Sequence, residues 1–544
     1  MNNQLNKAMT QIIFRCDASQ TIGTGHVMRC RTLARQLQER GAEIIFVCRQ
    51  HSGNLINLLE KEFNVIALTE HKLSSNKNIN NDELTGRKMY EAWLGCTQKI
   101  DADQTIQALD KLGYNKIRWI IIDHYGIDEQ WESQLKNHFR QSVPQLRIAV
   151  LDDLADRKHN ANIIVDQNYA NKSDYNRYKN LIPDSCIELL GPHYAIMGPE
   201  YSTLRALLPK RKYLQRVIVF FGGTDTSSLT LKALLALSEQ RFAHLAVDVV
   251  VSAHSRDYSD ITLLARKRHM TTIHSYLPSL ACLMVQADLA IGAGGTTTWE
   301  RACLHLPTLV VSIAENQIAA SKALDRSGYV KFMGTHEEIT QSDFSNALDL
   351  WCQNKLTFVS GDRLTDGYGA HRLATALMGS TNPLYLREAD ANDEALLLRW
   401  ANDPTVRAVS LSSDEISIER HRSWFQSSLL NPDRLHWILI DKDKAPLGQI
   451  RFDRVSSSSS IRLSFSLDRA VRGHGLAVPF IQIALRSLKK HWGNSLEVYA
   501  EVLSTNHASQ ACFARCGFLP SHDELKGLTI WRRSTEDSTK ICHD

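Results

Sequence analysis

The sequence predicts an α/β protein with two successive parallel-sheet units and a third, smaller α/β domain. Short apolar runs alternate with longer amphipathic stretches through the first two-thirds of the 544 residues, which is typical of a parallel sheet covered by helices. The alternation breaks off near residue 200 and then starts again. After the segment GSTNP at residues 379–383, which has the composition of a linker, the order of strands and helices changes. We therefore expect domains over residues 10–200, 201–360 and 384–536, with residues 361–383 as the linker.

The two parallel-sheet units are predicted from apolar runs of strand length. The expected strands of the first unit are residues 12–15, 44–47, 119–123, 147–151 and 163–165. Residues 29–40 and 103–112 have the amphipathic pattern of helices. The expected strands of the second unit are residues 217–221, 247–251, 289–291 and 308–312. The polar segment 74–81 interrupts the first unit, and we expect an exposed loop or insertion there. Two such units facing one cleft suit a nucleotide-bound substrate.

The third domain is predicted to begin with a strand at residues 386–387. Residues 437–441 and 448–452 have the pattern of a hairpin, and residues 462–467 that of a further strand. The serine run at residues 456–460 is expected to be a hairpin loop.

Composition and charge favour a soluble cytoplasmic protein. Hydrophobic residues make up 43% of the chain and charged residues 22%, which argues against extensive disorder. The net charge of +4 gives no reason to expect nucleic acid or a membrane as a partner, and no protein partner is evident. The 11 cysteines include no CxxC pair, which favours reduced thiols. The first residues lack a signal-peptide apolar region, and the apolar runs are too short to span a bilayer.

A glycine-containing loop follows the first expected strand and opens the first expected helix. Gly23 and Gly25 let the backbone approach a ligand, and they place His26 at the helix start, where backbone N–H groups attract anions. The helix dipole favours the neutral imidazole, which can accept a proton. From spacing alone, a general base and a helix-capping histidine are equally good interpretations, because one glycine-rich loop is a weak signal.

A second glycine loop, at residues 292–301, again follows a strand and opens a helix. Three glycines in this position are suited to cradle a pyrophosphate, and Glu300 can accept hydrogen bonds from ribose hydroxyls. The lysine of a Walker loop is missing, which excludes an ATPase-type site of that kind. Other loops at the same predicted sheet edge carry Gly223, Tyr125 and Asn316.

Five segments in order resemble the UDP-sugar hydrolases of pseudaminic acid biosynthesis. They are GTGHVMR at residues 23–29, DHY at 123–125, LDDLADR at 151–157, GGT at 294–296 and ENQ at 315–317. The resemblance covers roughly residues 10–360. It implies two Rossmann-like domains similar in fold to GT-B glycosyltransferases. It also implies hydrolysis of UDP-2,4-diacetamido-2,4,6-trideoxy-β-L-altropyranose at the anomeric carbon, which releases UDP.

The same resemblance implies roles for individual residues. His26 would be the catalytic base that activates water, with Tyr125 and Asn316 as catalytic residues near the sugar. The residues implied to bind the substrate or its UDP are Gly25, Gly223, Gly294, Gly295, Thr296, Glu300 and Gln317. Asp17 and Arg29 flank the first loop, where strand-end capping and a surface helix charge explain them at least as well as catalysis.

The C-terminal third contains the loop RGHGLA at residues 472–477, between an expected strand and an apolar helix. Backbone N–H groups in such a loop can hold the pyrophosphate of coenzyme A. NHAS at residues 506–509 and GF at 517–518 follow it, and together these segments resemble the GNAT acetyltransferase superfamily. The resemblance implies acetyl-CoA contacts from Leu467, Arg472, Gly473, His474, Gly475, Leu476, Ala477, Asn506 and Ser509.

Other segments of this domain resemble the acetyltransferases that modify the 4-amino group of the same UDP-sugar before the hydrolase acts. They are residues 386–387, 400–403, 421–425, 448–450 and 465–468. Many GNAT enzymes place a tyrosine four residues before the glycine of the Gly-Phe pair, and here Phe513 stands at that place. The acid that protonates the departing thiolate is therefore open between water, Ser509 and another hydroxyl.

The two resemblances describe consecutive steps on one substrate. The expected reactions are acetylation with acetyl-CoA as co-substrate, followed by hydrolysis, and no metal is expected. Fusing the two domains raises the effective concentration of the acetylated intermediate. Two alternatives stay open: a glycosyltransferase of GT-B fold that passes the sugar to an acceptor, and a C-terminal module that binds CoA without catalysis.

Overall fold

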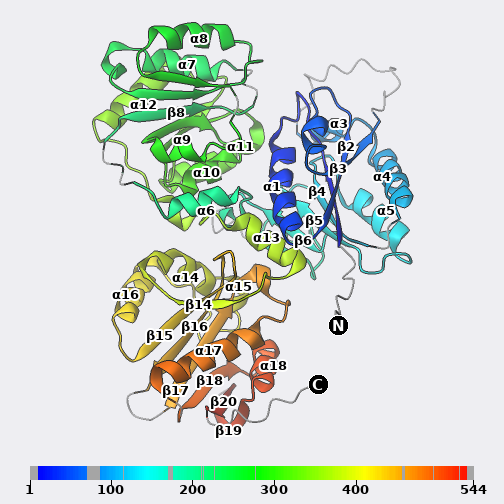
Figure 1. Cartoon of the computed structure of the whole chain (residues 1–544), viewed down its shortest axis with the longest axis vertical. Coiled ribbons are helices and arrows are strands. Elements are labelled where there is room, and N and C mark those ends of the chain that lie inside the picture. The colour runs from blue at the N-terminus through cyan, green and yellow to red at the C-terminus, as the bar shows by residue number, and fades with distance from the viewer. Residues whose placement is uncertain are drawn as a thin grey trace, which may run out of the picture. The chain divides into compact units, whose positions relative to one another are not determined.

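A computed structural model gives the architecture of the chain (Figure 1). It describes residues 10–69, 86–113, 116–169, 176–209, 211, 213–223, 225, 227–275, 277–455, 460–493, 495–525 and 527–535. The predicted loop at 74–81 and residues 456–459 of the serine run lie outside the described residues. The chain divides into two compact units, Met1–His371 and Arg372–Asp544.

The first half of unit 1 is a parallel sheet with helices packed against it. Among the described residues the strand order is β3-β2-β1-β4-β5-β6-β7. The strands are β1 (Gln11–Cys16), β2 (Glu43–Arg49), β3 (Asn64–Leu68), β4 (Ile117–Asp123), β5 (Arg147–Leu151), β6 (Ile163–Asp166) and β7 (Ile187–Leu190). The helices are α1 (Gly25–Glu39), α2 (Ile56–Leu59), α3 (Arg87–Trp93), α4 (Gln98–Leu112) and α5 (Glu129–Phe139). Central strands such as β1 are buried along their whole length, which explains their continuous apolar sequence.

The second half of unit 1 repeats this architecture. The described strands are all parallel and run β10-β9-β8-β11-β12-β13. The strands are β8 (Arg216–Phe220), β9 (Ala246–Val250), β10 (Thr271–His274), β11 (Leu289–Ala293), β12 (Thr308–Ser312) and β13 (Lys331–Thr335). The helices are α6 (Pro199–Arg205), α7 (Leu229–Leu237), α8 (Tyr258–Lys267), α9 (Ala281–Gln286), α10 (Thr297–Cys303), α11 (Glu315–Arg326) and α12 (Gln341–Cys352). The two Rossmann-like halves confirm the predicted α/β class.

The segment between the parallel sheets and the last sheet contains regular structure. Residues 361–383, expected as a linker, include the 3₁₀ helix η5 (Gly361–Arg363) and the helix α13 (Gly369–Met378). The division between the two compact units falls after His371, within α13.

Unit 2 contains a mixed sheet whose described strands run β14-β15-β16-β17-β18-β20-β19. They are β14 (Tyr385–Glu388), β15 (Arg434–Ile440), β16 (Pro446–Arg454), β17 (Ser460–Leu467), β18 (Glu497–Leu503), β19 (Leu519–Leu525) and β20 (Leu528–Ser534). The helices are α14 (Glu394–Ala401), α15 (Pro404–Arg407), α16 (Ile418–Leu429), α17 (Ala477–Trp492) and α18 (His507–Arg515). The predicted hairpin is confirmed as the antiparallel pair β15 and β16.

The β17–β18 pair is parallel and short. Within the described residues, pairing joins only Ser460–Arg462 to residues 497–499. Residues 463–467 of β17 pair with β16 on one side and with no strand on the β18 side. The sheet therefore opens along the end of β17, immediately before the loop that leads into α17.

Candidate active sites

His26 and Asp123 meet where α1 begins and β4 ends. Nδ1 of His26 lies 2.6 Å from Oδ1 of Asp123. Because a carboxylate only accepts hydrogen bonds, Nδ1 carries the hydrogen and Nε2 is left as the nitrogen that can take a proton. The Asp123 side chain is fully buried, whereas that of His26 keeps 11% exposure. A carboxylate that orients an imidazole in this way is the arrangement of a general base.

Arg29 holds the other side of the Asp123 carboxylate. Its Nε and Nη2 donate to the two oxygens of Asp123, each at 2.6 Å, and its Nη1 donates to Oδ2 of Asp153 at 2.6 Å. Burial would raise the pKa of Asp123, but the charges of Arg29 and His26 outweigh burial and keep that pKa below its ordinary value. Arg29 is itself buried. The interpretation of Arg29 as a surface helix charge is therefore wrong, because α1 turns this side chain toward the sheet.

Tyr125 and Asn316 join this cluster from the two halves of unit 1. The Tyr125 hydroxyl donates to Oδ2 of Asp153 at 2.6 Å. Asn316, in the first turn of α11, donates from Nδ2 to the Tyr125 hydroxyl at 3.5 Å. The His26 ring meets the Tyr125 ring edge-on, with centroids 4.6 Å apart. The three residues that the resemblance implied as catalytic thus lie together where the halves meet.

The glycine loops of the two halves approach each other at this point. Thr24 is the N-cap residue of α1, but its side chain makes no capping hydrogen bond. A Cβ added at Gly223 would lie 3.4 Å from Oγ1 of Thr24, and one added at Gly25 would meet nothing within 4 Å. The start of α1 therefore offers uncapped N–H groups beside open space, which suits an anionic ligand.

Asp17 lies outside this cluster and has a structural role. Its Oδ1 lies 2.7 Å from Nη1 of Arg15 and accepts a hydrogen bond from the backbone N–H of Arg49 at 2.6 Å. It joins the ends of β1 and β2, in agreement with the strand-end interpretation.

The second glycine loop packs closely against α11. A Cβ added at Gly294 would lie 2.5 Å from Oγ of Ser321, and one added at Gly295 would lie 3.7 Å from Nε2 of Gln317. Oε1 of Gln317 accepts a hydrogen bond from the backbone N–H of Ile313 at 3.1 Å, so this amide oxygen is already engaged within the protein. The need for glycine at position 294 comes from helix packing, independently of any ligand.

Thr296 and Glu300 lie at the start of α10. Thr296 is the N-cap residue and makes no side-chain capping hydrogen bond. Burial raises the pKa of Glu300 to about 7, against opposing effects of Tyr201 and Arg301. Glu300 is consequently a carboxyl group that changes charge near neutral pH.

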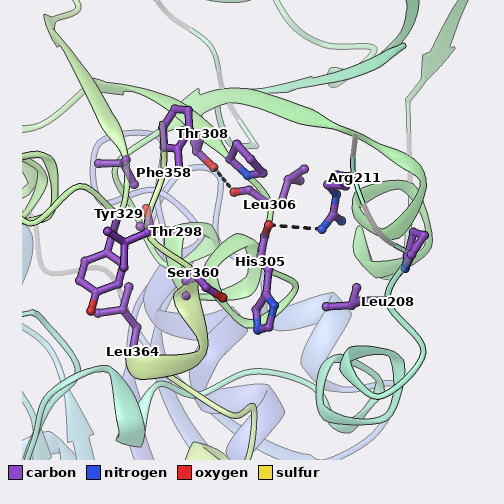
Figure 2. A pocket seen from close by; sticks show the side chains of 16 residues that line it. Leu208, Arg211, Thr298, His305, Leu306, Thr308, Tyr329, Phe358, Ser360 and Leu364 are labelled. Atoms are coloured by element: carbon purple, nitrogen blue, oxygen red, sulfur yellow. Dashed lines mark hydrogen bonds between the residues drawn. The ribbon is translucent and has the colours of Figure 1, made fainter. Parts of the chain in front are cut away.

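A cavity of about 300 Å³ lies in the second half, and Thr298 in the first turn of α10 is among the residues that line it (Figure 2). Pro307 and Thr308 line it at the amino end of β12, whereas the Gly294 loop follows the carboxyl end of the neighbouring parallel strand β11. Arg211 lines it too, but donates to the backbone oxygens of Leu304 and His305 at 2.8 and 3.2 Å. The cavity therefore reaches the amino end of β12, and its lining does not include His26, Tyr125 or Asn316.

The loop before α17 in unit 2 is held open by two glycines and by Arg472. Gly473 and Gly475 have φ angles of +79° and +74°, and a Cβ added at either would meet nothing within 4 Å. Arg472 donates to the backbone oxygen of Leu467 at 3.0 Å and to Oδ2 of Asp403 at 3.1 Å. Its guanidinium thus fixes the loop to β17 and α15 instead of pointing freely toward a ligand.

The other residues implied for CoA contact have distinct local roles. His474 lies with Nε2 3.1 Å from the backbone oxygen of Ala376. Leu476 is the N-cap residue of α17, which begins at Ala477, and makes no side-chain capping hydrogen bond. Asn506 caps α18 by accepting from the Ser509 N–H at 3.1 Å.

Phe513 occupies an apolar environment. Its ring centroid lies 5.6 Å from that of Phe465 and 5.1 Å from that of Phe518. Phe513 is 3% exposed and carries no hydroxyl, so it cannot supply a proton to a thiolate.

Comparisons with known proteins agree with this division of the chain. Residues 383–519 match the family described as "Acetyltransferase (GNAT) domain". The UDP-2,4-diacetamido-2,4,6-trideoxy-β-L-altropyranose hydrolase of Campylobacter jejuni is 23% identical over 320 residues, which are 59% of this chain and 97% of that protein. This chain joins a hydrolase-homologous region to a GNAT domain.

One further relative and one solved structure also align with this chain. An uncharacterised protein of Methanocaldococcus jannaschii is 23% identical over 524 residues, which cover 92% of this chain and 95% of that protein. Among solved structures, MurG of Acinetobacter baumannii aligns with 68% of this chain and 100% of its own, at 14% identity and a TM-score of 0.44.

No helix in the described part of the chain is both long and apolar enough for a membrane span.

Three residues of the hydrolase-homologous region were not singled out from the sequence. Asp153 lies within the LDDLADR segment but received no role there, although it bonds both Arg29 and Tyr125. Tyr90 and Trp93 of α3 pack on the Tyr125 ring, with centroids 5.2 and 5.9 Å away. The aromatic spacing in α3 gave no signal, because an aromatic pair on a short helix is equally typical of a core.

Proposed function

We propose that this chain is a bifunctional enzyme acting on one UDP-linked amino sugar. The GNAT domain acetylates the 4-amino group of UDP-4-amino-4,6-dideoxy-N-acetyl-β-L-altrosamine. The hydrolase-homologous region then releases UDP and free 2,4-diacetamido-2,4,6-trideoxy-altropyranose. The observation that carries the proposal is the placing of His26, oriented by Asp123, beside Tyr125 and Asn316 in a region homologous to a hydrolase of that sugar.

Hydrolysis needs a base beside the anomeric carbon and stabilisation of the departing diphosphate. Nε2 of His26 takes a proton from water as the water oxygen bonds to the anomeric carbon, while the bond from that carbon to the diphosphate oxygen breaks with its electron pair on UDP. The Asp123 carboxylate keeps Nδ1 protonated and stabilises the imidazolium that forms. The Tyr125 hydroxyl donates to Asp153, so its oxygen is directed to accept a hydrogen bond from Asn316 or from the sugar.

The diphosphate is assigned to the helix starts of α1 and α10. Uncapped N–H groups at Gly25 and at Thr296 favour negative charge, and the departing UDP carries that charge. Glu300 would accept hydrogen bonds from the ribose hydroxyls. No metal is needed for this scheme, because backbone N–H groups supply the electrostatic stabilisation.

Acetyl transfer is assigned to the opening along β17. The Gly473 and Gly475 loop would bind the pyrophosphate of acetyl-CoA at the start of α17, and the thioester would lie near Leu467. The neutral amine attacks the thioester carbonyl carbon, the C–N bond forms, and the C–S bond breaks with its electron pair on sulfur.

The test is to incubate the purified chain with the UDP-amino sugar, with and without acetyl-CoA, and to follow the products by mass spectrometry. Free diacetamido sugar and UDP that form only with acetyl-CoA are the expected result. Accumulation of acetylated UDP-sugar without UDP release would contradict the hydrolase assignment and favour a transferase that lacks its acceptor. No acetylation of the amine would contradict the GNAT assignment.

A further inference from the structure

A row of polar side chains crosses three strands of the GNAT domain on the face covered by α14 and α16. His436 on β15, Gln449 on β16 and Ser466 on β17 form this polar ladder. Nε2 of His436 lies 2.8 Å from Oε1 of Gln449, and Nε2 of Gln449 donates to Oγ of Ser466 at 3.2 Å. Ile438 pairs with Gln449 and packs with Phe425 of α16, which places the ladder on this face.

The hydrogen bonds of the ladder run in one direction. His436 is 8% exposed, and burial lowers its pKa to about 4, so its imidazole is neutral at pH 7. A neutral imidazole bonded to an amide oxygen donates through Nε2, and this fixes the amide so that its N–H groups face Ser466. One lone pair of the Ser466 oxygen is then occupied, while its second lone pair and its hydroxyl hydrogen are available to a ligand.

The end of the ladder lies at the opening in the sheet. Ser466 belongs to residues 463–467 of β17, which lack pairing on the β18 side within the described residues. A Cβ added at Gly448 would lie 2.6 Å from the Ser466 backbone oxygen, so glycine allows β16 and β17 to approach closely here. Nδ1 of His436 is buried and has no hydrogen-bond partner in the described part of the chain. A buried polar atom without a hydrogen-bond partner costs free energy of folding, so its presence needs an explanation such as a functional role.

We infer that Ser466 receives the acceptor amine beside the thioester and that Gln449 and His436 are positioning residues for it. The inference rests on the proposed acetyl transfer and names the side chains on the acceptor side of that site. The Ser466 oxygen accepts one N–H of the neutral amine, which directs the nitrogen lone pair toward the thioester carbonyl carbon. When the C–N bond forms and the C–S bond breaks, the amine nitrogen loses one proton to water and the thiolate gains one.

The experiment measures CoA release from acetyl-CoA by the full chain with the UDP-amino sugar and with a panel of other primary amines. Ser466→Ala is expected to lower kcat about 100-fold, the effect of losing one positioning contact on the reacting group, with KM for acetyl-CoA unchanged within about twofold. Ser466→Thr keeps the hydroxyl and is expected to restore kcat to within about tenfold of the unaltered chain. In Gln449→Ala, Ser466 loses the hydrogen bond that orients it. The kcat of this variant is expected to lie between those of Ser466→Ala and Ser466→Thr.

Ser464→Ala is the matched control, because Ser464 lies on the same strand and face and pairs with Arg451 instead of Gln449. Wild-type kcat in Ser466→Ala, or an equal loss in Ser464→Ala, would overturn the inference. If the chain acetylates another amine but not the UDP-amino sugar, the proposed substrate is wrong. The Ser466 and Ser464 variants are then compared with that amine, and the same outcomes decide the role of the ladder. If no amine causes CoA release, both the proposed acetyl transfer and the role of Ser466 are contradicted.

Discussion

The Arg29 guanidinium and the Asp123 carboxylate form a two-pronged ion pair, with both N···O distances at 2.6 Å. Such bidentate pairs are stronger and more directional than single contacts. The pair fixes the plane of the carboxylate that holds His26, and the third guanidinium nitrogen holds Asp153, which in turn holds Tyr125. One arginine thus connects the proposed base His26 to Tyr125.

Asp123→Asn should abolish most hydrolysis, because the amide favours the wrong imidazole tautomer and removes one of the two carboxylates that pair with Arg29. We expect kcat for UDP release from the acetylated UDP-sugar to fall on the order of 10⁴-fold. Asp248→Asn is the control, since Asp248 is a buried carboxylate paired with Arg216 at 2.7 Å in the second half. It should lower the urea midpoint while leaving kcat unchanged. A kcat within tenfold of wild type in Asp123→Asn would refute the role of the dyad.

Tyr125→Phe should have a smaller effect than loss of Asp123. Removing the hydroxyl breaks one hydrogen bond to a carboxylate that Arg29 still neutralises, at a cost of about 1–3 kcal/mol. We expect kcat/KM for hydrolysis to fall about 5- to 150-fold. Tyr178→Phe is the matched control: the Tyr178 hydroxyl lies 2.9 Å from Asp152 and from Asp166, outside the cluster. Equal kinetic losses in the two variants would show that the effect is only structural.

The stability of the hydrolase-homologous region should depend on Glu300 between about pH 4.5 and pH 7. Its pKa is raised from 4.5 to about 7 by burial. In this window the folded chain holds a proton that the unfolded chain has lost, so the free energy of unfolding falls as the pH rises and levels off above about 7. Glu300→Gln should remove this part of the slope. Thermal melts at several pH values give the stability of the wild-type chain and of Glu300→Gln as a function of pH. If stability changes with pH in the same way in both chains, the prediction is contradicted.

Gly475→Ala should weaken acetyl-CoA binding without touching hydrolysis. The φ angle of +74° is strained for a side chain that bears a Cβ, at a cost of about 1–2 kcal/mol, and the loop would shift to relieve it. We expect KM for acetyl-CoA to rise about 5- to 30-fold, while UDP release from the acetylated substrate stays constant. Gly493→Ala imposes similar strain at the other end of α17, where φ is +99°, and should change stability alone. An unchanged KM in Gly475→Ala would show that this loop does not hold the cofactor.

The central strands could be predicted from the sequence, but the edges could not. β4 and β11 are buried along most of their length, so their apolar runs are unbroken. β3 and β7 lie at the two edges of the first sheet and carry exposed positions, and neither was predicted. An edge strand needs only one neighbour, and its mixed pattern differs little from that of a loop.

The sequence by itself determined the α/β order and placed glycine loops at the starts of α1, α10 and α17, because backbone freedom and helix starts are local properties. It also placed His26 at the first turn of its helix. Only the tertiary structure decided which carboxylate orients His26, since Asp123 lies 97 positions away in the chain and comes into contact through the parallel pairing of β1 and β4. It likewise decided that Arg29 is an internal ion-pair partner, because burial depends on which helix face meets the sheet.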